Sequence, residues 1–168
     1  RKGVEDAWAA FQQAAPPEWM LEVVGSGDEA ARARLLALQE RHPGRLRYHG
    51  QCDAIGLVQL MQDSSVFLLP SYLDTGPTAL KEALAMGLWP LCYAYGGPAE
   101  YIQRFGWGSG VPLGQRDRLA EQLRRLLDTQ PWRNTDAQGS MIKAVRRALG
   151  REHIWCILRR EYDRISRT

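Results

Sequence analysis

The stretch SVFLLPSYLDTGPTALKEALAMG, residues 65–87, joins an apolar run to a helical pattern through a short polar corner. Residues 65–70 predict a buried strand, because a short apolar run bounded by turn residues is typical of a strand covered on both faces. Residues 77–86 predict a helix that ends at Gly87, and Pro77 suits the first helical turn, where its missing N–H costs nothing. A strand that passes directly into a helix indicates a parallel sheet covered by helices.

The rest of the chain repeats this alternation. Strands are expected over 21–25, 45–50, 65–70, 90–95 and 110–113, and helices over 3–14, 28–41, 54–63, 77–86, 98–104, 117–129 and about 138–167. The pattern predicts an α/β fold, a Rossmann-like parallel sheet with helices on both faces, in one domain over residues 1–168. Such sheets bind ligands beyond the carboxyl ends of their strands, so the loops after strands are the candidate sites.

Composition excludes several classes of protein. The sequence contains no run of ~18 apolar residues, so no transmembrane helix is expected, and no signal-peptide pattern opens the chain. Cys52, Cys92 and Cys156 lie far apart without histidines at ligand spacing, so no metal site is expected, and a reducing cytoplasmic location is the simplest interpretation. The net charge of +3 comes largely from arginines after Arg133. The acids among them favour a solvated helix face, although contact with a polyanion or, at the inner face of the membrane, with anionic lipid is the alternative; no nucleic-acid partner is expected.

The polar corner is the candidate site. At the start of its helix, the N–H groups of Gly76, Thr78 and Ala79 would point out of the helix end, where they and the helix dipole attract phosphate or carboxylate. Glu82, in the second turn, could accept hydrogen bonds from two vicinal hydroxyls, and Asp74 could bind a second polyol. Hydroxyls, phosphate and hydroxyls in this order describe a nucleotide sugar. Acids are also common near helix starts as caps, so an ordinary strand-to-helix corner stays open on these residues alone.

The helix that carries Glu82 has two expected faces. At about 100° per residue, Glu82 shares a face with small or flexible residues that leave room for a ligand: Thr78, Ala79, Ala85 and Met86. The face expected to pack on the sheet consists of Leu80, Ala83, Leu84 and Gly87.

Short motifs surround this corner in a fixed order. They are Arg1-Lys2-Gly3, VVGSGDE (23–29), RLRYHG (45–50), Pro70-Ser71, Asp74, Glu82-Ala83, Gly87, Pro90, Gly96-Gly97-Pro98-Ala99-Glu100 and a final helix with Tyr162. This series resembles the donor-binding, C-terminal half of the retaining glycosyltransferases of family 4, which have the GT-B architecture. The resemblance covers nearly the whole chain, and an ordered set of motifs is more specific than one motif.

The resemblance implies a glycosyltransferase of the hexosyltransferase type. It would transfer a sugar from a nucleotide diphosphate sugar, with retained anomeric configuration and without a metal or other cofactor, to a glycan, lipid or other acceptor, as in polysaccharide biosynthesis. Lys2 and Asp74 would be the catalytic residues, with Lys2 on the diphosphate and Asp74 facing the donor hexose. The remaining donor-binding residues would be Thr75, Gly76, Pro77 and Thr78 for sugar and phosphates, Glu82 for the ribose, and Tyr48, His49 and Gly50 beside the base.

The sequence departs from the family pattern in two respects. Asp74 stands where the family has Glu, which moves the carboxylate back by ~1.5 Å, one C–C bond. The family's first strand and its acceptor-binding N-terminal domain would precede Arg1. In the 3-2-1-4 strand order that strand lies at the sheet centre, so we expect another chain to fill its place, the sheet to rearrange, or upstream residues to exist outside this sequence. The chain alone is expected not to turn over substrate.

Two other functions stay open. A non-catalytic nucleotide-binding or interaction module descended from the family would explain the shorter acid at Asp74. A sugar-nucleotide epimerase of the same two-domain architecture is the second alternative, but Lys2-Gly3 and Glu82-Ala83 favour the transferase.

Overall fold

The computed structural model describes residues 2–149 of the 168-residue chain. Its strands are β1 (Leu21–Val24), β2 (Leu46–Gly50), β3 (Val66–Leu69), β4 (Trp89–Tyr93) and β5 (Ser109–Val111). Its α-helices are α1 (Val4–Ala14), α2 (Glu29–Arg41), α3 (Ala54–Gln62), α4 (Thr78–Ala85), α5 (Gly97–Phe105), α6 (Arg116–Thr129) and α7 (Thr135–Leu149), with a 3-10 turn at Pro131–Arg133.

The predicted order of strands and helices is confirmed. The elements differ from the prediction at their ends: α7 begins at Thr135, three residues before the predicted start, and β4 stops at Tyr93. β5 stops at Val111, before Pro112, which has no N–H to donate to a ladder. The predictions for the helix around Tyr162, for Cys156 and for the arginines after Leu149 concern residues that lie outside the described range.

The strands form two parallel sheets rather than one. β1 pairs with β2, and β4 pairs with β3 on one side and β5 on the other. Within residues 2–149 no ladder joins β1 to β3, which is where the resemblance places the family's first strand. A rearranged sheet in which β1 pairs directly with β3 is therefore not what the structure adopts.

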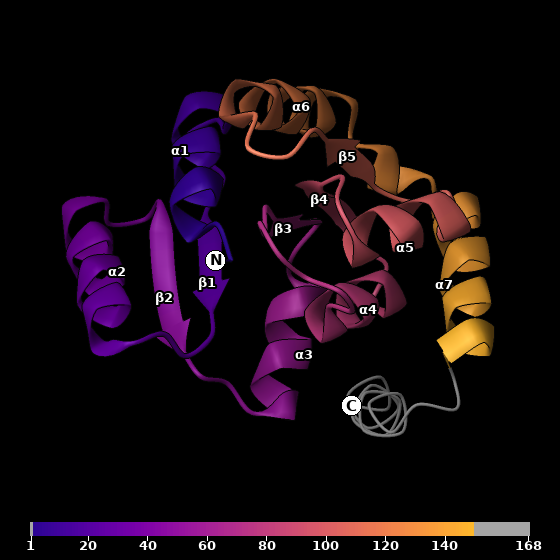
Figure 1. The fold of residues 1–168 in the computed structure, drawn as a ribbon, viewed down its shortest axis with the longest axis horizontal. Coiled ribbons are helices and arrows are strands. Elements are labelled where there is room, and N and C mark those ends of the chain that lie inside the picture. The colour runs from indigo at the N-terminus through magenta and orange to yellow at the C-terminus, as the bar shows by residue number, and fades with distance from the viewer. Residues whose placement is uncertain (1, 150–168) are drawn as a thin grey trace.

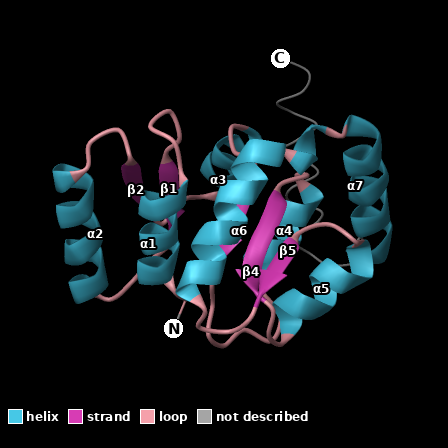
Figure 2. Cartoon of the chain, turned by 90° about the horizontal axis from the view of Figure 1, so that it is seen from above, coloured by secondary structure: helices cyan, strands magenta, loops and turns pink. Residues whose placement is uncertain are grey.

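Helices cover both faces of the three-stranded sheet. α6 lies on one face, next to α1, while α4 lies on the other, with β4 between them (Figure 1). The view from above shows the same neighbours, with α2 beside β2 and α7 beyond α5 (Figure 2). The predicted α/β architecture with helices on both faces is confirmed.

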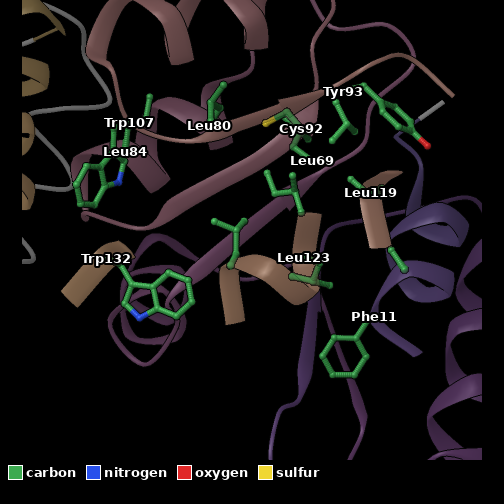
Figure 3. Packing of buried hydrophobic residues seen from close by; sticks show 14 of the residues in the cluster. Phe11, Leu69, Leu80, Leu84, Cys92, Tyr93, Trp107, Leu119, Leu123 and Trp132 are labelled. Carbon is green, nitrogen blue, oxygen red and sulfur yellow. The ribbon is translucent and has the colours of Figure 1, made fainter. Parts of the chain in front are cut away.

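One main apolar cluster joins these layers. Figure 3 shows Leu69 and Cys92 of the strands among Leu80 of α4 and the leucines Leu119 and Leu123 of α6. The cluster also contains Phe11 of α1. Because it includes residues before and after the polar corner, the corner is attached to a packed support.

The predicted packing face of α4 is confirmed at Leu80, Ala83 and Leu84, each 0% exposed, and at the buried Gly87. The prediction was wrong for Ala85, which was placed on the open face and is 1% exposed. α7 also packs against α4, so α4 is covered by α7 as well as by the sheet.

Candidate functional site

The start of α1 lies against the end of β3. Gly3 has φ 72°, and a Cβ built on it would lie 1.9 Å from the carbonyl oxygen of Pro70. Only glycine fits a left-handed residue with a backbone atom at that distance. This contact brings Lys2 beside the polar corner.

Lys2 and Asp74, the two predicted catalytic residues, are in contact. The Nζ of Lys2 lies 2.5 Å from Oδ2 of Asp74. The Lys2 side chain is 56% exposed, whereas that of Asp74 is 11% exposed. An ammonium group has three donors, so the ion pair leaves Lys2 able to donate to a ligand as well.

The Gly96-Gly97 turn supports the backbone of the corner. The Gly97 N–H donates to the Asp74 carbonyl at 3.2 Å, and a Cβ on Gly97 would lie 2.7 Å from the Thr75 carbonyl oxygen. The Asp74 side chain accepts a long hydrogen bond of 3.4 Å from the Gly76 N–H. The sequence marked the Gly-Gly pair as a motif but did not predict that it packs under Asp74 and Thr75.

The N-terminus of α4 is open to a ligand. Pro77 is the N-cap residue, no side chain of the described residues caps the helix, and no acid lies in its first turn. Thr78 and Ala79 are exposed. Their N–H groups, with the helix dipole, form a site that favours an anion.

Glu82 is half-buried on the second turn of the same helix. Burial raises the pKa of its carboxyl group, and the charge of Lys81 opposes that shift. Within residues 2–149, no hydrogen bond or ion pair satisfies this carboxylate. A half-buried carboxylate that accepts no hydrogen bond from the described residues is suited to hydroxyl donors from a ligand.

The predicted base-binding residues lie at the end of β2, beside the loop after β1. The Tyr48 hydroxyl donates to the Gly25 carbonyl at 3.0 Å, and the Gly50 carbonyl accepts from the Gly25 N–H at 2.8 Å. His49 Nε2 lies 2.5 Å from Oε2 of Glu22, so its side chain is already paired. The structure thus groups the predicted residues as Lys2 with the 74–82 segment, and Tyr48 to Gly50 with Gly25.

A shallow hollow of about 480 Å³ lies along β2. Tyr48 and His49 line it together with residues of α2 and of the turn before β2. No lining residue belongs to the 70–82 stretch, so this hollow is separate from the corner at α4.

The described part of the chain holds no group of three or more His, Cys, Asp or Glu side chains arranged for a metal ion. Among its helices, none is sufficiently long and apolar to cross a membrane.

The fold matches that of GT-B glycosyltransferases. The chain belongs to the family of glycosyl transferases group 1, which matches residues 1–147.

Known relatives are considerably longer than this chain. It is 28% identical over 151 residues to a glycogen synthase of Halorhodospira halophila, covering 83% of this chain and 31% of that protein. Sucrose-phosphate synthase from Thermosynechococcus elongatus is 25% identical, with a TM-score of 0.72 over 98% of this chain and 42% of that one. Anabaena HepE, solved in complex with UDP-glucose, is 18% identical, with a TM-score of 0.74 over 99% of this chain and 46% of its own.

Proposed function

We propose that this chain is the donor-binding, C-terminal half of a retaining family 4 glycosyltransferase. The observation that carries the proposal is the contact between Lys2 and Asp74 beside the uncapped N-terminus of α4. Family membership supports it. The complex of HepE with UDP-glucose and that of the pneumococcal O-GlcNAc transferase GtfA with UDP and GlcNAc support a nucleotide diphosphate sugar as donor.

The donor diphosphate would lie at the N-terminus of α4. The exposed N–H groups of Thr78 and Ala79 would donate to its oxygens, and Lys2 would add a positive charge from the side of α1. When the bond between the anomeric carbon and the diphosphate oxygen breaks, negative charge grows on the departing diphosphate. Fixed donors and an ammonium group at that position stabilise this charge, which lowers the barrier.

The sugar and ribose would be held on either side of the diphosphate. Asp74 would accept hydrogen bonds from the hexose hydroxyls, and Thr75 to Pro77 would pass close to the sugar. Glu82 would accept from the two ribose hydroxyls, which supply the donors that its half-buried carboxylate lacks. Tyr48, His49 and Gly50 would border the base, with His49 oriented by its pairing with Glu22.

The remaining assignments are also proposals. The donor domain spans residues 1–168, acts without a metal or other cofactor, and works with a separate domain that binds the glycan, lipid or other acceptor. The place between β1 and β3 is taken by a further strand, from upstream residues or from a second chain. The protein acts in polysaccharide biosynthesis in the cytoplasm, where it can contact the inner face of the membrane.

Calorimetric titration tests the proposal. The full-length protein is titrated with UDP, ADP and GDP and with their glucose conjugates, and release or transfer of labelled sugar is then measured. We expect one nucleoside diphosphate to bind most tightly and its sugar conjugate to be hydrolysed or transferred. Failure of every nucleotide to bind would reject the proposal, whereas binding without turnover of any sugar would support the non-catalytic alternative.

A further inference from the structure

Asp6 is a buried carboxylate that the proposed donor site does not use. It lies in the first turn of α1 and is 1% exposed. A buried charge is retained only where partners compensate for lost water. Among residues 2–149, three such partners contact both oxygens of Asp6.

The partners come from three separate segments. Oδ2 accepts from the Tyr72 hydroxyl at 2.7 Å and from the Tyr93 hydroxyl at 2.6 Å. Oδ1 lies 2.6 Å from Nε of Arg116, the first residue of α6. Asp6 therefore connects α1 to the segment after β3, to the end of β4 and to the start of α6.

The two tyrosines differ in how firmly the fold holds them. Tyr93 is 0% exposed, with its ring beside the core and its hydroxyl directed away from the labelled apolar side chains (Figure 3). Tyr72 is 40% exposed and lies in the corner segment, two residues before Asp74. Its ring packs edge-on against Tyr93, with 5.4 Å between centroids. Tyr93 is thus a buried support, whereas Tyr72 is half-exposed and is held by Asp6 and by the ring of Tyr93.

We propose that Asp6 is a positioning residue for the donor-binding corner and acts through Tyr72. This proposal rests on the proposed function of that corner. Residues 2–6 contact the corner segment at three points: Lys2 at Asp74, Gly3 at Pro70, and Asp6 at Tyr72. The third contact holds residues 72–76 against the Gly96-Gly97 turn, so that Asp74 and the α4 N-terminus keep a fixed geometry towards the donor. The Tyr72 hydroxyl points to Asp6 and is not available to the sugar.

Two variants and one control test the proposal in the full-length protein. Tyr72→Phe removes the half-exposed link and should leave the fold intact, and Asp6→Ala removes the acceptor of that link. Tyr93→Phe, the matched control, deletes the same kind of hydrogen bond to the same oxygen from a rigid strand. Hydrogen exchange is followed in peptides covering 70–80 and 93–101, because the Gly97 N–H donates to the Asp74 carbonyl.

Tyr72→Phe should speed exchange in both peptides, whereas Tyr93→Phe should lower the melting temperature and leave this exchange nearly unchanged. Unchanged exchange in Tyr72→Phe, or equal acceleration in Tyr93→Phe, would overturn the positioning role. Hydrogen exchange needs no ligand. It therefore tests whether Asp6 and Tyr72 hold the corner segment in place even if the protein binds no nucleotide and the proposed function fails.

The kinetic readout separates positioning from direct contact. With UDP-glucose, or whichever donor the titration identifies, Tyr72→Phe should lower kcat/KM by about ten- to a hundredfold, since a misplacement near 1 Å has effects of that size. Asp6→Ala removes the acceptor of the Tyr72 hydroxyl, so the double variant Asp6→Ala with Tyr72→Phe should have the same kcat/KM as Asp6→Ala alone if Tyr72 acts through Asp6. A further loss in the double variant would show that Tyr72 affects the donor independently of Asp6 and would overturn the proposal.

Discussion

Nζ of Lys2 lies 2.5 Å from Oδ2 of Asp74, so these two proposed catalytic residues neutralise each other in the free protein. The corner consequently has little net charge of its own. The first attraction for a diphosphate would come from the N-terminus of α4 and from the two donors that Lys2 retains. Asp74 in turn holds the flexible Lys2 side chain near the place where the leaving group would lie.

Replacing Lys2 with Met should weaken binding of UDP by about ten- to a hundredfold, since one charge-assisted hydrogen bond contributes about 1.5–3 kcal/mol. Turnover should fall further, because the charge on the departing diphosphate grows during the reaction. The melting temperature should fall as well, because the Asp74 side chain, which is only 11% exposed, loses its charge partner. Calorimetry, steady-state kinetics and a thermal melt measure the three effects.

Lys2→Arg is the matched control for charge. It should keep most of the affinity for UDP and lose more in kcat, because a planar guanidinium presents its donors differently from an ammonium group. Equal affinity for UDP in the Met and Arg variants and the native protein would exclude Lys2 from the diphosphate site.

At Asp74, substitution with Asn should reduce turnover by about ten- to a hundredfold, since it removes the charge that orients Lys2 and accepts sugar hydroxyls. Asp74→Glu restores the acid of the family pattern and should retain turnover or change which sugar is preferred. A panel of sugar conjugates on one nucleotide measures both. If Asp74→Asn were as active as the native protein on every donor, Asp74 would have no catalytic role.

Replacing Glu82 with Gln should change the stability of the fold and the affinity for nucleotide in opposite directions. Burial raises its pKa in the folded state above the ordinary value, so the folded chain binds more protons than the unfolded chain between these two values. The stability due to this group is therefore fully present at low pH and falls as the pH rises through the raised pKa. Glu82→Gln should remove this loss, so the variant should be more stable than the native protein at pH 7, as denaturant unfolding at several pH values can show.

Nucleotide binding should change in the other direction. An amide is a weaker acceptor than a carboxylate, so Glu82→Gln should reduce affinity for UDP by about ten- to a hundredfold if two ribose hydroxyls donate to it. In the native protein, affinity should also fall as the pH drops through the raised pKa of Glu82. Glu121→Gln, at a largely exposed site on α6, is the control and should alter neither property. Unchanged affinity in Glu82→Gln would reject the ribose assignment.

Local patterns predicted most of the fold. Apolar runs and the spacing of glycine and proline predicted the order of strands and helices. Asp28, at the start of the predicted helix 28–41, caps α2 by accepting from the Ala31 N–H at 2.7 Å. The encounter of Lys2 with Asp74, 72 positions apart, followed from the family resemblance and not from any pattern in the chain.

What the sequence did not predict depends on distant partners. Asp6 looks like an ordinary acid in the first turn of a helix, where most such residues are exposed. Its burial results from hydroxyls 66 and 87 positions away. The supporting role of Gly97 was missed for the same reason, since only the fold shows that the Thr75 backbone occupies the space of a side chain.

Gly97→Ala tests whether this support matters for donor binding. The new methyl group would lie 2.7 Å from the Thr75 carbonyl oxygen and 2.8 Å from its carbon, so the backbone of the corner must shift. We expect a loss of about 1–3 kcal/mol in unfolding free energy and weaker binding of UDP, because the shift moves Asp74 and the α4 N-terminus together.

Gly139→Ala is the matched control: it lies within α7 with nothing inside 4 Å of the added carbon, and it should stabilise the chain by about 0.5–1 kcal/mol. Denaturant unfolding and UDP titration of both variants give the comparison. If Gly97→Ala lost stability but bound UDP like the native protein, the turn would support the fold without positioning the donor site.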